Sequence, residues 1–129
     1  MSKIILKSIR VPLLQVNDKQ IPQNEQLQII IYPRVISDTT PASNEYIGSC
    51  KLEMRKESEK DIEEKSFYIG IELEGRFLDK NGDSDYTSKR DMVMKELLPH
   101  LNATLRTLAA LAKIPSSFIP EEILAELND

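Results

Sequence analysis

The single cysteine and the single histidine are the first candidates for chemistry, because a thiol beside an imidazole can act as a nucleophile. No third residue marks either Cys50 or His100 as part of a catalytic set. Cys50 also falls on the apolar side of an alternating segment, where a small buried thiol is the ordinary case. We therefore expect both residues to be structural and the protein not to be an enzyme.

The stretch DKNGDSD, residues 79–85, has the residue types of a calcium loop. An EF-hand loop needs Gly at its sixth position and Glu at its twelfth, where this chain has Ser84 and Arg90. An Asn-Gly turn leading out of a sheet explains the stretch as well. We expect no metal site, and the four glycines of the chain form no phosphate-binding loop, so we expect no cofactor.

Size and charge limit the remaining possibilities. The chain has 129 residues, of which 40% are hydrophobic, enough for one compact domain with its own core. The net charge is −4, from 17 basic and 21 acidic residues, so the chain lacks the positive charge that nucleic acid requires. We expect no nucleic-acid partner and no membrane insertion, since no apolar run is long enough to span a bilayer. A lone thiol and the short apolar start MSKIILKSIR predict a cytoplasmic protein.

Four segments in the first 80 residues predict an antiparallel sheet with one apolar face. Pro12 and Pro33 indicate edge positions, because proline cannot donate a ladder hydrogen bond. We expect a long polar connection over residues 15–26 and a charged hairpin connection over residues 55–65. The strands are expected at residues 3–14, 27–37, 46–54 and 66–78.

A long helix should follow, over residues 88–113, starting at Ser88 with Asp91 in a capping box. Pro99 lies nearly opposite the apolar stripe and should kink the helix around the sheet. Ile114 precedes Pro115 and ends the helix, and Pro120 starts a short helix over residues 120–128. The stripe that should cover the sheet consists of Val93, Met94, Leu97, Leu98, Leu101, Leu105, Leu108 and Leu111.

The opposite side of this helix carries alanines where a solvated face is usually charged. Ala103, Ala109 and Ala110 stand there beside Asn102 and Arg106. Alanine is the best helix former, so propensity alone is one explanation. The alternative is a second contact surface in an oligomer, because small side chains permit close approach.

The order of elements resembles the bacterial SecB export chaperones. It predicts an α+β fold in which a four-stranded antiparallel sheet is followed by a long kinked helix and a short C-terminal helix. The resemblance covers nearly the whole chain as a single domain. The matching segments are KIILKSIRVP, EQLQIIIYPRVIS, YIGSCKLEMRKES, SFYIGIELEGRFL and ELLPHLNATLRTLAALAKIPSSFIPEEIL.

The resemblance implies a homotetramer, built as a dimer of dimers, that acts as an ATP-independent holdase for non-native polypeptides in protein export. Plain core packing is the alternative for each implied groove residue. The client groove would match Leu13, Leu14, Val16 and Ile21 in the connection, Phe77 and Leu78 in the wall, and Ile119, Ile123, Leu124 and Leu127 near the C-terminus. The oligomer interface would match Asn102, Ala103, Arg106 and Ala110.

Two features depart from that family. Only 5% of residues are aromatic, although client grooves usually depend on aromatic anchors. Lys51, Glu53 and Arg55 alternate in sign on the sheet, where the family offers an acidic face to the export motor. A dedicated adaptor with the same fold, such as a chaperone associated with a toxin-antitoxin pair, is therefore the second hypothesis. An enzyme or small-ligand carrier with a pocket between sheet and helix is the third.

Overall fold

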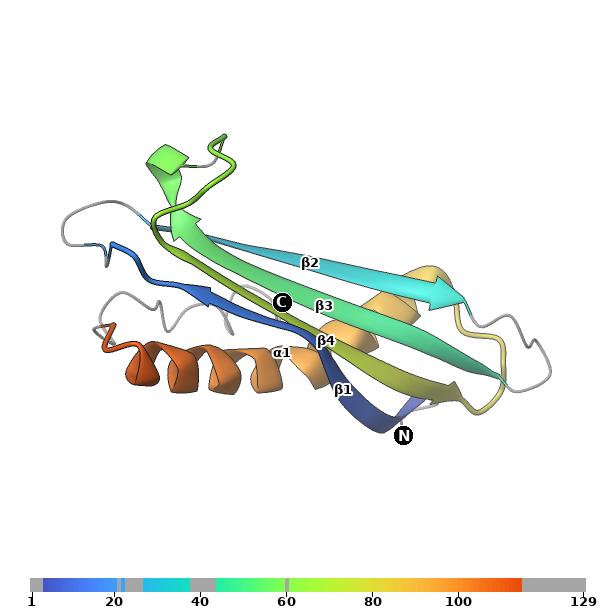
Figure 1. The fold of residues 1–129 in the computed structure, drawn as a ribbon. Coiled ribbons are helices and arrows are strands. Elements are labelled where there is room, and N and C mark those ends of the chain that lie inside the picture. The colour runs from blue at the N-terminus through green and yellow to red at the C-terminus, as the bar shows by residue number, and fades with distance from the viewer. Residues whose placement is uncertain (1–3, 21, 23–26, 38–43, 60, 115–129) are drawn as a thin grey trace.

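A four-stranded sheet with a helix across one of its faces forms the molecule (Figure 1). The computed structural model describes residues 4–20, 22, 27–37, 44–59 and 61–114. The strands are antiparallel in the order β1-β4-β3-β2, and the predicted α+β class is confirmed. The predicted short helix over residues 120–128 lies outside the described residues. The elements are β1 (Ile4–Asn17), β2 (Leu27–Ser37), β3 (Glu45–Lys56), the 3-10 turn η2 (Glu57–Glu59), β4 (Tyr68–Asp79) and α1 (Tyr86–Leu111).

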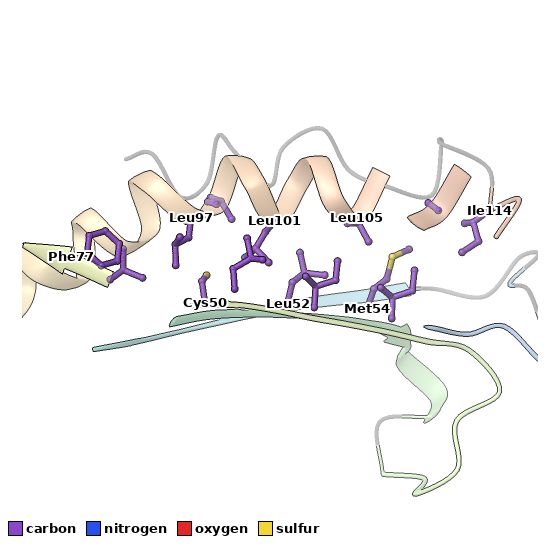
Figure 2. Packing of buried hydrophobic residues seen from close by; sticks show 14 of the residues in the cluster. Cys50, Leu52, Met54, Phe77, Leu97, Leu101, Leu105 and Ile114 are labelled. Carbon is purple, nitrogen blue, oxygen red and sulfur yellow. The ribbon is translucent and has the colours of Figure 1, made fainter. Parts of the chain in front are cut away.

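The core lies between α1 and the two central strands, β3 and β4. Their alternation is as the sequence predicts, since every second side chain is buried and the residues between them point to the other face. Figure 2 shows these side chains meeting those of α1 in a single layer. The buried hydrophobic side chains of the two strands are Tyr46, Cys50, Leu52, Met54, Ile69, Ile71, Leu73 and Phe77.

β1 is an edge strand, as expected, but it continues to Asn17. The prediction that it ends at residue 14 and gives way to a connection was therefore wrong. Gln15 and Asn17 are polar because they point away from α1, where they stand opposite Gly70 and Tyr68. These polar side chains on the outward face made the end of the strand resemble a loop in the sequence.

Two bulges explain why β1 shows no regular alternation in the sequence. The pairing with β4 shifts between Leu6 and Ser8 and again between Arg10 and Leu13. Each bulge adds one residue, so the side chains on the α1 side change from even to odd numbers and back again. Pro12 lies inside the second bulge, where its missing N–H removes no ladder hydrogen bond.

β2 forms the other edge of the sheet, and Pro33 sits within it opposite Cys50. An edge strand tolerates proline because one side of its backbone has no strand partner. The apolar side chains that the sequence assigned to one face do pack against the core and are partly buried. They are Leu27, Ile29, Ile31 and Val35.

α1 begins one turn earlier than predicted. Asp85 is the N-cap, and its Oδ1 accepts a hydrogen bond of 2.8 Å from the backbone N–H of Ser88. The predicted cap at Ser88 was wrong, because Asp85 takes the N-cap position and Ser88 is the third residue of the helix, whose N–H the cap accepts. The turn before it is fixed by Asp79, whose buried carboxylate accepts hydrogen bonds from the backbone N–H and the hydroxyl of Ser84.

The buried face of α1 follows a row of residues spaced by four, which winds around the helix by about 40° at each step. Leu111, predicted to lie in the stripe, is 77% exposed because the row has moved to the other side by the end of the helix. Ala109, predicted to lie on the far side, is buried for the same reason. Pro99 is exposed, as expected. The buried row is Val93, Leu97, Leu101, Leu105 and Ala109.

A Schellman motif ends α1. Lys113 takes the left-handed conformation, with φ of 60°, and its N–H donates to the carbonyl of Ala110. The N–H of Ile114 donates to the carbonyl of Ala109 at 2.8 Å, and both apolar side chains of this pair are buried. The expected helix end at Ile114 is thus correct to within a few residues. Within the described residues, no helix combines the length and hydropathy needed to cross a membrane.

Gly48 allows α1 to approach β3 closely. A Cβ atom at this position would overlap Cγ2 of Val93, which is fully buried. Gly75 stands opposite Gly48 on β4, and the ring of Phe77 occupies the space that their missing side chains leave. This pair of glycines therefore sets where the first turns of the helix rest on the sheet.

Candidate functional site

An uncovered apolar row on β1 is the candidate site. Leu14 and Val16 stand opposite Ile71 and Ile69 of β4, on the face of the sheet that α1 covers. The two β4 residues are fully buried, whereas Leu14 is 55% and Val16 38% exposed. α1 packs mainly over β2, β3 and β4, so it leaves this part of β1 open.

Two further residues extend the row, and the sequence analysis missed both. Ile9 stands opposite Gly75 on the same face and is 36% exposed. Val11, which is 53% exposed, lies with Pro12 in the second bulge, across from Leu73. The sequence does hold a signal that could have revealed them, because its apolar residues change between odd and even positions where the bulges occur. We call Ile9, Val11, Leu14 and Val16 the β1 apolar edge.

Other predicted groove residues do not join this row. Leu13 stands opposite Glu72, and Leu78 stands opposite Ile5, both on the face turned away from α1. Phe77 is fully buried and stacks on Tyr46, with ring centroids 5.1 Å apart. Its side chain belongs to the core, so it does not form a wall open to a client. The predicted groove residues outside the described part of the chain are Ile21, Ile119, Ile123, Leu124 and Leu127.

The predicted oligomer face of α1 lies away from the sheet. Ala103 and Ala110 are exposed, and Asn102 and Arg106 are half-buried. The Oδ1 atom of Asn102 is buried and has no hydrogen-bond partner among the described residues.

Cys50 and His100 do not form a reactive pair. The Cys50 thiol is buried beneath α1, 3.9 Å from the Sδ atom of Met94. Burial raises the pKa of Cys50 to about 12, which keeps it a thiol rather than the nucleophilic thiolate at neutral pH. His100 is exposed on α1, and its backbone carbonyl accepts a hydrogen bond from the Thr104 hydroxyl. In the described segments, no three His, Cys, Asp or Glu side chains are grouped as metal ligands.

A polar cleft of about 330 Å³ lies on the face away from α1, beside the connection from β3 to β4. Gln15 and Tyr68 form part of its wall, and its charged lining consists of Lys19 and Lys65 with Glu63 and Glu64. Burial, assisted by the nearby Glu53 carboxylate, raises the pKa of Tyr68 to about 12. The phenol therefore stays protonated at neutral pH. The four charges of the lining balance, so the cleft has no preference for the sign of a ligand.

Comparison with known proteins identifies the fold. No family model and no curated protein sequence matches the chain. Among solved structures, the chain is similar to the Mycobacterium tuberculosis SecB-like chaperone Rv1957 in complex with a ChAD peptide from the Rv1956 HigA1 antitoxin. The TM-score is 0.65 at 16% identity, and the match covers 87% of this chain and 85% of that chain. The fold predicted from the order of elements is confirmed: this chain has a SecB-like fold.

Proposed function

We propose that this protein is an ATP-independent chaperone that holds non-native polypeptide against the β1 apolar edge. The observation that carries the proposal is the exposure of Leu14 and Val16 beside fully buried partners on β4. Aliphatic side chains that stay exposed to solvent beside a fully buried core are typical of a surface that a partner covers. The shared fold supports the proposal, because the similar structure is that of a chaperone with a bound antitoxin peptide.

Burial of client side chains would supply the binding free energy. Each half-exposed aliphatic side chain of the edge contributes on the order of 1 kcal/mol when a client covers the rest of it. Contacts of this size are individually weak and independent of sequence detail, which suits reversible holding of unfolded chains. The predicted groove residues near the C-terminus remain part of the proposal as predictions.

Suppression of aggregation tests the chaperone function. A chemically unfolded test protein is diluted from denaturant into a stoichiometric amount of this protein without nucleotide, and light scattering is followed. We expect suppression by the wild type and its loss in the double variant Leu14→Glu, Val16→Glu. The matched control is Ser8→Glu, Gln15→Glu, which adds the same two charges to exposed positions on the other face of β1. Equal suppression by both double variants would refute the proposed site.

A dedicated adaptor for one protein partner is the second candidate. The β1 apolar edge is entirely aliphatic, whereas promiscuous surfaces usually include aromatic or methionine side chains. An adaptor would suppress aggregation of its own partner but not of unrelated test proteins. Suppression across three unrelated clients would exclude this reading.

We also propose a homotetramer, built as a dimer of dimers, in which the far face of α1 packs against another copy. The exposure of Ala103 and Ala110 supports a contact there. The proposal does not extend to an export motor that docks on an acidic sheet face. The strand residues facing away from α1 include more basic than acidic side chains.

A further inference from the structure

The face of the sheet turned away from α1, here called the outer face, has a charge opposite to that of the whole chain. Figure 2 shows α1 and the core side chains on the other side of the sheet. The chain has a net charge of −4, but the outer face carries six basic and four acidic side chains. They are Lys7, Arg10, Arg34, Lys51, Arg55 and Arg76, with Glu45, Glu53, Glu72 and Glu74.

Ion pairs on the outer face neutralise most of these charges at one end of the sheet. Glu45 accepts from both Lys7 and Arg76, at 3.0 and 3.1 Å. Glu74 accepts from Arg10 at 2.7 Å and, through its second oxygen, at 3.3 Å. Toward β2 the pairing is looser, since Lys51 Nζ lies 3.7 Å from Oε1 of Glu53.

Arg34 and Arg55 take part in none of these ion pairs. Arg34 is exposed on β2, and no described carboxylate pairs with it. Arg55 on β3 donates one hydrogen bond of 3.1 Å from Nη2 to the amide oxygen of Gln28. Its Nε atom is buried and has no acceptor in the described segments. The surrounding strands therefore satisfy only part of the hydrogen-bonding capacity of the Arg55 guanidinium.

Two tyrosines complete this part of the outer face. Tyr68 stands opposite Arg55, and its ring lies back over Gly70, whose added Cβ would come within 2.8 Å of the ring. Tyr32 stands opposite Lys51 and is 41% exposed. Tyrosine and arginine are the residues most enriched at the energetic centres of protein interfaces. We call Tyr32, Arg34, Lys51, Arg55 and Tyr68 the outer patch.

We propose that the outer patch binds an acidic, extended segment of a partner protein. Carboxylates fit the guanidinium groups of Arg34 and Arg55, which can hold them through two parallel hydrogen bonds each. The ring of Tyr68, lying on the sheet, provides a platform for the aliphatic part of an acidic side chain. The excess positive charge also steers an acidic partner to this face rather than to the negatively charged remainder of the chain. This site is separate from the β1 apolar edge, since the two lie on opposite faces of the sheet.

Fluorescence anisotropy of a labelled oligoglutamate peptide tests the proposal. Oligoglutamate has no apolar side chains, so its binding does not report on the β1 apolar edge. We expect it to bind the wild type at low salt and the double variant Lys51→Gln, Arg55→Gln about tenfold more weakly. The matched control is Arg90→Gln, Lys95→Gln, which removes the same charges from exposed positions on α1 and should bind as the wild type does.

A variant that changes the shape of the outer patch but not its charge tests whether binding needs more than electrostatic attraction. Gly70→Ala leaves every charge in place but displaces the Tyr68 ring, so we expect severalfold weaker binding with an unchanged melting temperature. Three results would overturn the proposal: no binding of oligoglutamate, equal loss of binding in both charge variants, or tighter binding of an oligothymidine strand than of the peptide. The last would indicate a general polyanion surface.

Discussion

Leu14 and Ile71 face each other across β1 and β4 on the same side of the sheet, but Leu14 is 55% exposed and Ile71 is fully buried. The helix axis lies over the central strands and β2, so the core ends between these two residues. Everything proposed for the β1 apolar edge depends on this abrupt boundary.

The boundary predicts unequal costs of truncation. Ile71→Ala should destabilise the fold by about 2–5 kcal/mol, because it leaves a cavity in the core. Leu14→Ala should cost less than about 1 kcal/mol, because its side chain is already half in water. Chemical denaturation of both variants measures the difference. Equal costs would mean that another chain covers Leu14 in solution.

The close approach of α1 to β3 predicts coupling between Gly48 and Val93. Gly48→Ala should destabilise the fold by about 1–3 kcal/mol, since the new methyl group overlaps the valine side chain. Val93→Ala should cost less in the Gly48→Ala background than in the wild type, because the methyl group then fills part of the space. A double-mutant cycle by denaturation checks this. Strict additivity would show that the helix does not rest on β3 at this point.

The two faces of α1 should respond differently to substitution. Leu101→Ala, on the buried face, should cost about 2–5 kcal/mol of stability without changing the mass of the assembly. Ala103→Glu, on the exposed face, should leave the monomer fold intact and dissociate the proposed oligomer, because a close helix contact would bury the new carboxylate without a partner. Light scattering coupled to gel filtration measures the masses. A wild type that elutes as a single chain would exclude the interface.

Glu59 predicts a pH-dependent loop. Its carboxylate accepts hydrogen bonds from the hydroxyl and N–H of Ser66, at 2.7 and 3.1 Å, and from the N–H of Phe67. The hydrogen bond from the Ser66 hydroxyl is the main cause that lowers the pKa of Glu59 below its ordinary value of 4.5. A lowered pKa means that the stabilisation is complete above the ordinary value and is lost as the pH falls through the folded value.

Amide hydrogen exchange checks this loop. Protection of the Ser66 and Phe67 amides should fall on acidification below the ordinary pKa of a glutamate, while amides in the middle of β4 keep theirs. Glu59→Gln should weaken the protection of both loop amides at neutral pH, because a neutral amide accepts less strongly than a carboxylate. Unchanged protection in that variant would show that the backbone alone holds the loop.

Much of the fold could be predicted from the sequence because the central strands bury mainly one face, which gives a clear alternation of apolar and polar residues. β3 and β4 turn one buried apolar row toward α1, and only Ser49 and Gly70 are buried on their other face, so the predicted apolar face of these strands was correct. The prediction for β1 failed because two bulges each shift the register by one residue, so no single alternation of period two runs along the strand. The cap at Asp85 was missed because two acceptable capping sequences overlap within one turn.

The candidate site was less accessible to sequence analysis. Leu14 and Val16 were named, but as part of a connection rather than of a strand that the helix leaves uncovered. Leu13 and Phe77 were named with them from the resemblance to the SecB groove, although one faces the outer side and the other fills the core. Exposure at a sheet edge depends on where the helix axis crosses the strands, and that is set by distant residues such as Gly48.

The most direct test of the chaperone proposal is site-specific photocrosslinking to an unfolded client. Cys50 is buried with a raised pKa, so a cysteine introduced at an exposed position can be labelled selectively with a benzophenone maleimide. The variants are Leu14→Cys on the β1 apolar edge and Gln15→Cys on the adjacent position, which faces the other way. The proposal predicts strong crosslinks to the unfolded client from position 14 and few from position 15. Equal crosslinking from both positions, or crosslinks only from position 15, would contradict it.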